Sequence, residues 1–368
     1  MTEIGLIGLP NVGKSTVFSL LTKISVPIEK FPFTTIEPNV GVIEVPDGRL
    51  DFLSSHLKPK KKTYATIKFV DIAGLVKGAS QGEGLGNKFL AHIREVDGIV
   101  HILRFFFDNT ISSSIGEVNP IEEIKVINLE LLFSDEEILK NYVSKLVPKA
   151  RSGDKIAASR MEFIDLLIRI CNETLSIYEV RKFIRSHMND LKDKELISLL
   201  RQLLSNKDVM YLLNYDETIE RNAVNEKIYE VENFTGCKCL CLAAKFELSL
   251  LDFPEEERKK LRYEYAVNED EVKNFIQHAV KNLGLITFYT VVGDEFRAWL
   301  IKQGSSILDA AGKIHSDMRD GFINAEVCEF DTFKNTPDLR VLHQQGNIKI
   351  YGKDYIVKDG DIIKINFR

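Results

Sequence analysis

Short apolar segments alternate with amphipathic stretches and loops along much of the chain. Their length and the polar turns that bound them are typical of buried strands. Strands that alternate with helices predict an α/β fold with a mostly parallel sheet. The predicted strands are Glu3–Ile7, Val40–Val45, Thr66–Asp71, Gly98–Leu103, Val209–Asn214 and Cys237–Ala243.

A long helical region interrupts this alternation between about Ser134 and Ser205. Apolar residues recur there at spacings of three, four and seven, and charged residues fill the other faces. This pattern predicts amphipathic helices, including a pair packed as a coiled-coil-like hairpin. Two interpretations stay open for the region: a recognition arm, or packing alone.

The pattern changes again after Gly284, where short strands and turns predominate. These elements predict a small mixed α+β domain. We interpret it as a docking module, because it has no His, Cys or carboxylate constellation typical of catalysis. The predicted elements are a hairpin of Ile286–Val292 and Glu295–Ile301 around Gly293-Asp294, a short helix near Ile307–Ile314, and strands at Phe322–Phe330, Ile348–Tyr351 and Asp361–Phe367.

Composition is that of a globular protein, with 44% hydrophobic and 28% charged residues, and 368 residues suggest two or three domains. We expect neither secretion nor membrane insertion, because the sequence has no apolar leader and no run of 18 apolar residues. The net charge of −5 does not by itself predict a nucleic-acid partner. The clearest basic patch, Lys58–Lys62, is more typical of a solvated loop.

Cys237, Cys239 and Cys241 recur at every second position, which places them on one face of a strand. That spacing is poor zinc geometry, so we interpret them as buried, reduced thiols. Reduced thiols favour a cytosolic location.

The loop Gly8–Ser15 fits the pattern G-x-x-x-x-G-K-S between a predicted strand and a predicted helix. Small residues let successive backbone N–H groups meet phosphate oxygens. Lys14 can reach the β and γ phosphates, and the Ser15 hydroxyl can ligate Mg²⁺. The helix that starts at Thr16 directs its N-terminus to the anion. The sequence therefore predicts a nucleoside triphosphate site rather than a simple glycine-rich turn.

Two further segments narrow the class of nucleotide-binding protein. Asp71-Ile-Ala-Gly74 follows a predicted strand as D-x-x-G, in which the aspartate supports Mg²⁺ through water and the Gly74 N–H meets the γ-phosphate. Thr35, in the loop Phe31–Pro38, can supply a second hydroxyl to Mg²⁺. Together, in this order and spacing, the motifs favour a switch NTPase.

The segment expected to read the base is unusual. A guanine-specific protein of this class carries N-K-x-D after the strand, whereas here Asn214-Tyr-Asp-Glu217 reads N-x-x-E. Adenine lacks the two-donor edge that an aspartate reads, so relaxed or reversed base preference is expected. Ala243–Lys245 is placed where the last base-contacting loop belongs. The alternative interpretation of Asn214 and Glu217 is a turn followed by a helix cap.

These residues together resemble the YchF, or Obg-like ATPase, family of P-loop proteins of the translation-factor class. The resemblance spans nearly the whole chain. It implies a P-loop nucleotide-binding domain at 1–133 and 206–280, a helical insertion at 134–205, and a C-terminal TGS domain of ubiquitin-like β-grasp fold at 281–368. The matching segments are Gly8–Thr16, Phe31–Asn39, Asp71–Ser80, Asn214–Glu217 and Arg297–Trp299.

The resemblance also implies an activity and a setting: hydrolysis of ATP in preference to GTP, with Mg²⁺, by a protein that binds the ribosome in the cytoplasm. We expect the large subunit as the ribosomal partner, and neither a membrane nor a specific DNA sequence. Asn11 matches an asparagine that helps to hold K⁺ near the phosphates.

By position, the resemblance makes Lys14 the catalytic residue that bridges the β and γ phosphates. Ser15 and Thr35 would ligate Mg²⁺, and Asp71 would support it through water. Asn214 and the Tyr215 backbone would meet the base. The implied nucleotide-binding residues are Asn11, Val12, Gly13, Lys14, Ser15, Thr16, Gly74, Asn214, Tyr215 and Glu217.

We assign no residue to the positioning of the water that attacks the nucleotide. Leu75 stands where Ras-like enzymes carry the water-orienting glutamine, and leucine cannot hydrogen-bond water. The family commonly offers a histidine in the loop that is Asp108–Gly116 here, but this loop has none. His92 and His101 are interpreted as structural. We therefore expect slow intrinsic turnover.

Three rival functions stay open at this point. One is a GTP-specific Obg-type GTPase, which the N-x-x-E segment disfavours. Another is a regulatory nucleotide-binding protein with negligible hydrolysis, which Leu75 favours. The last is a metabolic phosphotransferase, although the sequence shows no acceptor pocket with a general base.

Overall fold

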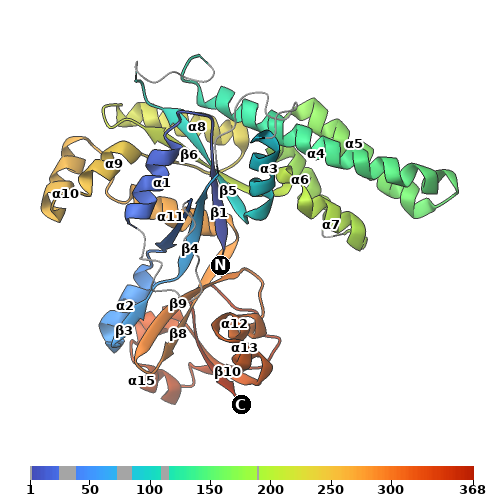
Figure 1. The fold of residues 1–368 in the computed structure, drawn as a ribbon. Coiled ribbons are helices and arrows are strands. Elements are labelled where there is room, and N and C mark those ends of the chain that lie inside the picture. The colour runs from blue at the N-terminus through green and yellow to red at the C-terminus, as the bar shows by residue number, and fades with distance from the viewer. Residues whose placement is uncertain (1, 25–38, 73–84, 109–115, 189) are drawn as a thin grey trace.

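The computed structural model describes residues 2–24, 39–72, 85–108, 116–188 and 190–368. Its first sheet has the strand order β2-β4-β1-β5-β6-β7 (Figure 1). All neighbours in this sheet are parallel except β2 and β4, so the predicted α/β class is confirmed. The strands are β1 (Glu3–Ile7), β2 (Val40–Glu44), β4 (Thr66–Asp71), β5 (Gly98–Phe105), β6 (Asp208–Tyr215) and β7 (Cys239–Leu242).

Helices connect these strands, and Figure 1 shows α1 on one side of β1 and α3 on the other. α11 packs on the sheet through Phe275, whose ring stacks on Phe69 of β4 with centroids 5.6 Å apart. Cys239 and Cys241 of β7 are buried free thiols, as predicted, and Cys237 is half-buried. The helices are α1 (Lys14–Lys23), α3 (Leu85–Glu95), α8 (Arg221–Thr235), α9 (Ala244–Leu250), α10 (Glu255–Glu264) and α11 (Glu271–Asn282).

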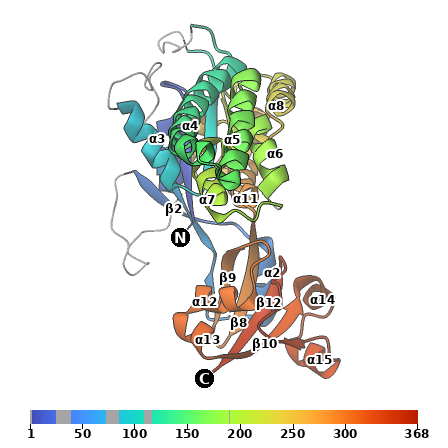
Figure 2. The same ribbon diagram turned by 90° about the vertical axis from the view of Figure 1, so that its right-hand side faces the viewer.

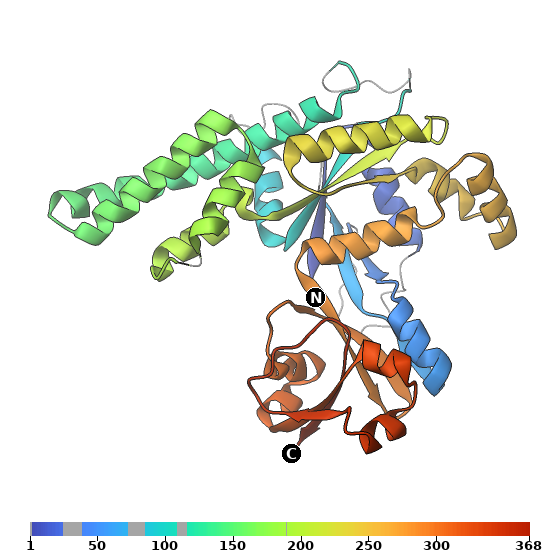
Figure 3. The same ribbon diagram turned by 180° about the vertical axis from the view of Figure 1, so that it is seen from behind.

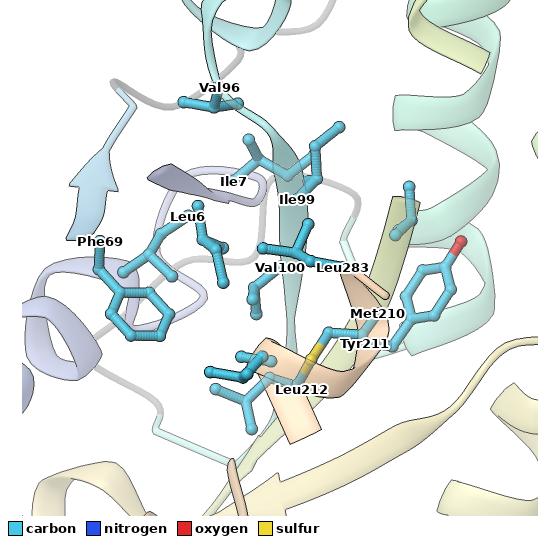
Figure 4. Packing of buried hydrophobic residues seen from close by; sticks show 14 of the residues in the cluster. Leu6, Ile7, Phe69, Val96, Ile99, Val100, Met210, Tyr211, Leu212 and Leu283 are labelled. Carbon is cyan, nitrogen blue, oxygen red and sulfur yellow. The ribbon is translucent and has the colours of Figure 1, made fainter. Parts of the chain in front are cut away.

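The core of this domain lies along the central strands. Leu6, Val100 and Leu212, from three neighbouring strands, have no exposed surface, and Figure 4 shows them packed together. Apolar residues on both faces of a strand are typical of parallel sheets covered on both sides. Close packing requires glycine at position 98, because a Cβ there would lie 2.2 Å from Cδ2 of Leu283.

A helical arm projects from the sheet (Figures 1 and 3). Its long helices pack side by side as an antiparallel hairpin, as predicted, and Asp154 caps the second of them. The first helix crosses Ser134, where we expected the insertion to begin, because Asn119 caps it and Pro120 starts it. The arm comprises α4 (Pro120–Arg151), α5 (Lys155–Thr174), α6 (Ile177–Met188) and α7 (Lys194–Gln202).

Asp135 fastens this arm at its base. The side chain is fully buried in α4, and its two carboxylate oxygens accept the backbone N–H groups of Leu204 and Ser205, each at 2.8 Å. These two residues belong to the 3₁₀ turn η3 (Leu204–Asn206), which leads into β6. The carboxylate therefore joins the start and the end of the helical region.

The C-terminal part forms a second sheet in the order β11-β10-β12-β8-β9-β3 (Figure 2). The predicted helix is present as α12 (Ile307–Ile314), which packs on this sheet and is followed by α13 (Ser316–Asp320). The predicted hairpin and strands are present, with ends within two residues of the prediction. The strands are β3 (Lys61–Thr63), β8 (Leu285–Val292), β9 (Glu295–Lys302), β10 (Phe322–Glu329), β11 (Lys349–Tyr351) and β12 (Asp361–Phe367).

The strand β3 corrects part of the interpretation of Lys58–Lys62 as a solvated loop: the lysine side chains are exposed, as expected, but Lys61 and Lys62 belong to an edge strand. Lys61 and Lys62 pair in parallel with β9, far away in the sequence. The lysines also meet acidic partners: Lys60 lies 2.6 Å from Asp294, Lys61 3.0 Å from Glu295, and Lys62 2.7 Å from Asp51. Lys60, Lys61 and Lys62 therefore form contacts within this protein.

The two sheets are connected beside α2 (Gly48–Leu57). Tyr289 of β8 donates its hydroxyl to Asp47 at 2.6 Å, and Arg49 pairs with Asp359 at 2.8 Å. Two short helices, α14 (Phe330–Asn335) and α15 (Leu339–Gln344), complete the C-terminal part. Within the described residues, no helix combines the length and apolar character needed to cross a membrane.

Candidate nucleotide-binding site

The glycine-rich loop between β1 and α1 has the conformation of a phosphate cradle. Gly13 has φ of +85°, and its carbonyl accepts the N–H groups of Thr16 and Val17, both at 3.0 Å. A Cβ on Gly13 would lie 2.1 Å from Nδ2 of Asn214, and one on Gly8 would lie 2.8 Å from the carbonyl of Ile102. Glycine is thus required at both positions by close approach of other atoms.

Among the described residues, no side chain caps the N-terminus of α1. The N-cap Gly13 has no side chain to accept the first N–H groups, and the first turn of α1 contains no acidic residue. An uncapped helix N-terminus presents backbone donors and a partial positive charge. Lys14 and Ser15, the first two residues of α1, add an ammonium and a hydroxyl at the same place.

Lys14 and Asp71 meet in an ion pair. They are brought together because β1 and β4 are parallel neighbours, with Leu6 in register with Asp71, so that both strands end at the same edge of the sheet. The two side chains are only 11% and 17% exposed. In this state the lysine that should meet phosphates is held by the carboxylate that should support Mg²⁺.

A cavity of about 760 Å³ lies beside this ion pair, a volume suited to a nucleotide. It contains the phosphate loop at one end and the segment that follows β6 at the other. Most of the predicted nucleotide-binding residues that the structure describes line it. The lining residues are Leu9, Pro10, Asn11, Gly13, Lys14, Ser15, Thr16, Phe106, Phe107, Asp108, Asn214, Tyr215, Asp216, Glu217, Lys245 and Leu248.

Asn214 connects three parts of this cavity. Its side chain is buried; Nδ2 donates to the carbonyl of Val12 at 2.9 Å, and Oδ1 accepts the N–H of Ala244 at 3.4 Å. The amide thus joins the phosphate loop to the start of α9, which follows β7. Positioning of these two loops is a role that the sequence did not indicate, and contact of Asn214 with a base stays a prediction.

Tyr215 turns its side chain away from the cavity toward α11. Its hydroxyl donates to Glu271 at 2.9 Å, and the same carboxylate pairs with Arg221 at 2.5 Å and accepts the N–H of Ala243 at 3.2 Å. Burial raises the pKa of Glu271, and Arg221 and Tyr215 oppose that shift. Glu271 therefore holds Tyr215 and Ala243 together, and contact of the Tyr215 backbone with a base stays a prediction.

Similar proteins are found over the full length of the chain. It is 36% identical to "Ribosome-binding ATPase YchF" of Bacillus subtilis (99% of this chain, 98% of that protein) and 38% identical to the protein of that name from Escherichia coli O157:H7 (99% and 98%). It is 39% identical to "Obg-like ATPase 1" of Xenopus laevis (99% and 92%). The chain belongs to the YchF family.

Family-model and structural comparisons agree with this assignment to the YchF family. Residues 3–137 match the model described as "50S ribosome-binding GTPase", and residues 285–368 match YchF-GTPase_C, described as "Protein of unknown function (DUF933)". The solved "Structure of the Schizosaccharomyces pombe YchF GTPase" superposes with a TM-score of 0.83 at 30% identity, covering 99% of this chain and 97% of that one.

One wall of the cavity was not predicted from the sequence. Phe106, Phe107 and Asp108 follow β5 and line the cavity, and Phe107 is 71% exposed. Arg104 holds this wall: its Nε donates to the carbonyl of Phe106 at 3.1 Å, and its guanidinium lies 4.5 Å from the Phe106 ring centroid. The available signal was the aromatic run directly after a buried strand, at the edge where parallel strands end.

Several predicted residues need separate comment. Thr35, Gly74 and Leu75 lie outside the described residues. Val12 is buried and meets Asn214 through its carbonyl. His101 is buried in β5, where burial lowers its pKa to about 3, and it does not line the cavity. That burial agrees with the structural role predicted for His101.

Proposed function

We propose that this YchF-family chain is a nucleotide-dependent switch that binds and slowly hydrolyses ATP with Mg²⁺ and associates with the ribosome. The relatives named above are ribosome-binding and Obg-like ATPases, which supports the activity and the partner. The observation that carries the proposal is the Lys14–Asp71 pair at the uncapped N-terminus of α1, beside the cavity. We propose the cytoplasm as its location.

Mg²⁺ fits the oxygen ligands at this site. Ser15 lines the cavity, and the Asp71 carboxylate forms an ion pair with Lys14, the residue before Ser15. Such hard oxygen ligands suit Mg²⁺, which bridges nucleotide phosphates and neutralises their charge. Thr35 is proposed as the second hydroxyl ligand. Asn11, which lines the phosphate end of the cavity, is proposed to help hold K⁺.

We assign catalysis to positioning and charge stabilisation. Lys14 and the N–H groups of α1 would bind the β and γ phosphates and stabilise charge that develops between them. Slow turnover is proposed because Leu75 has no group that could orient the attacking water. A regulatory protein with negligible hydrolysis is the second candidate, and the same leucine favours it.

ATP is proposed as the preferred nucleotide because Glu217, in the N-x-x-E segment, replaces the aspartate that reads guanine. Glu217 lines the base end of the cavity with Lys245. The ribosomal partner is proposed to be the large subunit, which the family description "50S ribosome-binding GTPase" supports. The C-terminal part is proposed to be the TGS domain.

Titration calorimetry with ATP and GTP in Mg²⁺ tests the base preference. We expect tighter binding of ATP, and a GTP affinity tenfold or more above that for ATP would reject it. Lys14→Ala should abolish ATP binding or phosphate release, with Lys23→Ala at the other end of α1 as a matched control. Measuring phosphate release with and without ribosomes separates a slow ATPase from a regulatory binding protein.

A further inference from the structure

Arg104 is a buried charged residue near the end of β5, a strand in the middle of the first sheet. The rest of this strand is mostly apolar, and Arg104 is only 3% exposed. Burial of a guanidinium is costly unless its donors are satisfied, and an apolar side chain often fills such a place at no loss of stability. The donors of Arg104 are therefore the property that distinguishes it from an apolar residue at this position.

Those donors serve the segment that follows the strand. Phe106, Phe107 and Asp108, which we call the cavity wall, have neither helical nor strand conformation, and the ladder between β5 and β6 ends before them. Nε of Arg104 donates to the carbonyl of Phe106 at 3.1 Å, and Nη2 donates to the carbonyl of Asp108 at 3.5 Å. The guanidinium thus supplies backbone partners that a neighbouring strand supplies within the sheet.

The same guanidinium also holds the ring of Phe106. It lies 4.5 Å from the ring centroid, a distance at which a cation is attracted to the face of an aromatic ring. The ring approaches the phosphate loop as well, because a Cβ on Gly13 would come within 3.6 Å of Cε1 of Phe106. The ring that Arg104 holds therefore lies beside the phosphate loop.

The backbone of Arg104 is anchored to two other parts of the protein. In the sheet it is in register with Asn214 of β6, the residue that joins the phosphate loop to the start of α9. Its N–H donates to Oε2 of Glu123 at 3.0 Å, and Glu123 lies in the first turn of α4. Figure 1 shows α4 continuing from there into the arm. The cavity wall is thus connected through Arg104 to both the sheet and the arm.

We propose that Arg104 is a positioning residue for nucleotide binding, which holds the cavity wall where the nucleoside part of the nucleotide lies. This inference rests on the proposed binding of ATP, and it names a residue that acts through its neighbours, since Arg104 itself does not line the cavity. Without its donors the wall samples other positions. The apparent affinity then falls in proportion to the fraction of molecules that have the wall in place.

The nucleoside is the part of the ligand that this wall can contact favourably. Phosphates are bound by backbone N–H groups and the Lys14 ammonium, whereas a phenyl ring and a carboxylate offer them no donor. A phenyl ring suits the flat face of a base or the carbon atoms of ribose. The wall lines the same cavity as Asn214 and Glu217, so a nucleotide that has its phosphates at the loop brings its nucleoside between them.

The test compares ATP with inorganic tripolyphosphate, which has the phosphates of ATP and no nucleoside. Titration calorimetry in Mg²⁺ measures both ligands on the full-length wild type, Arg104→Met and Arg104→Lys. Methionine keeps an unbranched apolar chain without donors, and lysine keeps the charge. Arg181→Met is the matched control, because Arg181 is another buried arginine that donates to a backbone carbonyl, that of Lys207 at 3.0 Å, just before the amino end of β6.

We expect Arg104→Met to bind ATP about tenfold or more weakly and to bind tripolyphosphate as tightly as wild type. Arg104→Lys should recover part of the loss. In a phosphate-release assay the KM for ATP should rise with kcat unchanged, because the nucleoside contacts are the same in the ground state and the transition state. Arg181→Met should bind both ligands as wild type does, even where its melting temperature falls.

Unchanged ATP binding by Arg104→Met overturns the role of Arg104 and leaves the proposed function standing. An equal loss for ATP and tripolyphosphate also overturns it, because the whole site is then disturbed. If Arg104→Met does not fold, the same comparison with Arg104→Lys decides. If tripolyphosphate binds wild type too weakly to measure, the KM and kcat values decide. A wild type that binds no ATP overturns both the inference and the proposed function.

Discussion

At the scale of single residues, Asp71 competes with the phosphates of a nucleotide for the ammonium group of Lys14. The ammonium and the carboxylate neutralise each other, so a nucleotide must break the pair before Lys14 meets its phosphates. In the proposed function, Asp71 would support Mg²⁺ and would then no longer neutralise Lys14. Binding of metal and nucleotide are then coupled through one ion pair.

Asp71→Asn separates these effects. Without Mg²⁺ we expect ATP to bind about tenfold more tightly than to wild type, because Lys14 loses a charged partner worth roughly 1.5–3 kcal/mol. With Mg²⁺ we expect ATP hydrolysis to fall by at least about tenfold. Calorimetry with EDTA or Mg²⁺ and a phosphate-release assay measure the two effects. Asp97→Asn, at the amino end of the sheet, should change neither.

Glu123 makes stability depend on pH. It is buried in the first turn of α4, accepts the Arg104 N–H at 3.0 Å, and has a pKa raised by burial to about 8. The folded chain therefore holds the proton of the Glu123 carboxyl group more tightly than the unfolded chain does. Protonated Glu123 makes its full contribution to the free energy of unfolding below about pH 4.5. This contribution is lost as the pH rises toward 8.

Glu123→Gln should therefore melt at a higher temperature than wild type at pH 8, with a smaller difference at pH 5.5. The gain should amount to a few kcal/mol at most, since each unit of pKa shift corresponds to about 1.4 kcal/mol. Thermal unfolding at both pH values measures it. The neighbouring, half-exposed Glu122 supplies the control: a similar gain in Glu122→Gln would contradict the role of burial.

Some residues of the site could be predicted from the sequence and others could not. The loop Gly8–Ser15 and Asp71 were identified because their chemistry is local and regularly spaced. The network around Glu271 was not, because its members come from three separate segments and none belongs to a motif. The same holds for Asn214, whose partners lie on the phosphate loop and after β7.

At the scale of elements, buried strands were predicted well and one edge strand was missed. β5 and β6 are rich in apolar residues and buried along nearly their whole length, and that apolar pattern predicted their ends within two residues. β3 consists of Lys61–Thr63, which are polar, and it is held by pairing with β9. No local pattern encodes such a pairing, since the partner strand is distant in the sequence.

The attachment of the arm predicts a strong effect from one carboxylate. Asp135→Ala leaves two buried N–H groups, of Leu204 and Ser205, without their acceptor. Each such group costs about 1–3 kcal/mol, so we expect the free energy of unfolding to fall by roughly 2–6 kcal/mol, with a lower melting temperature. Asp135→Asn, which keeps one acceptor, should lose less. The exposed Glu137→Ala should lose almost nothing, and an equal loss there would refute the explanation.

At the scale of the whole molecule, α11 links its functional regions. Glu271 at its start holds Tyr215 and Ala243 beside the nucleotide cavity, and Gln277 in its middle donates to the carbonyl of Pro46 before α2. The chain then continues directly into β8 of the C-terminal sheet. A shift of α11 on nucleotide binding would therefore reach the C-terminal sheet.

Contacts beside α2 resist independent movement of the two sheets. Tyr289 of β8 donates to Asp47, which also accepts the N–H of Arg49 at 2.8 Å as the N-cap of α2. Gln277 of α11 donates to the carbonyl of Pro46 at 2.7 Å. The segment before α2 is thus held by both the nucleotide domain and the C-terminal sheet.

Tyr289→Phe tests this connection, because it removes one hydrogen bond to a largely buried carboxylate and keeps the ring. We expect a loss of about 1–2 kcal/mol and faster amide hydrogen exchange in α2 and β8, with ATP affinity unchanged. Tyr355→Phe is the matched control, since it removes a Tyr–Asp361 bond of 2.9 Å inside the C-terminal part. If both variants speed exchange in α2 equally, the Tyr289–Asp47 contact does not couple the two sheets.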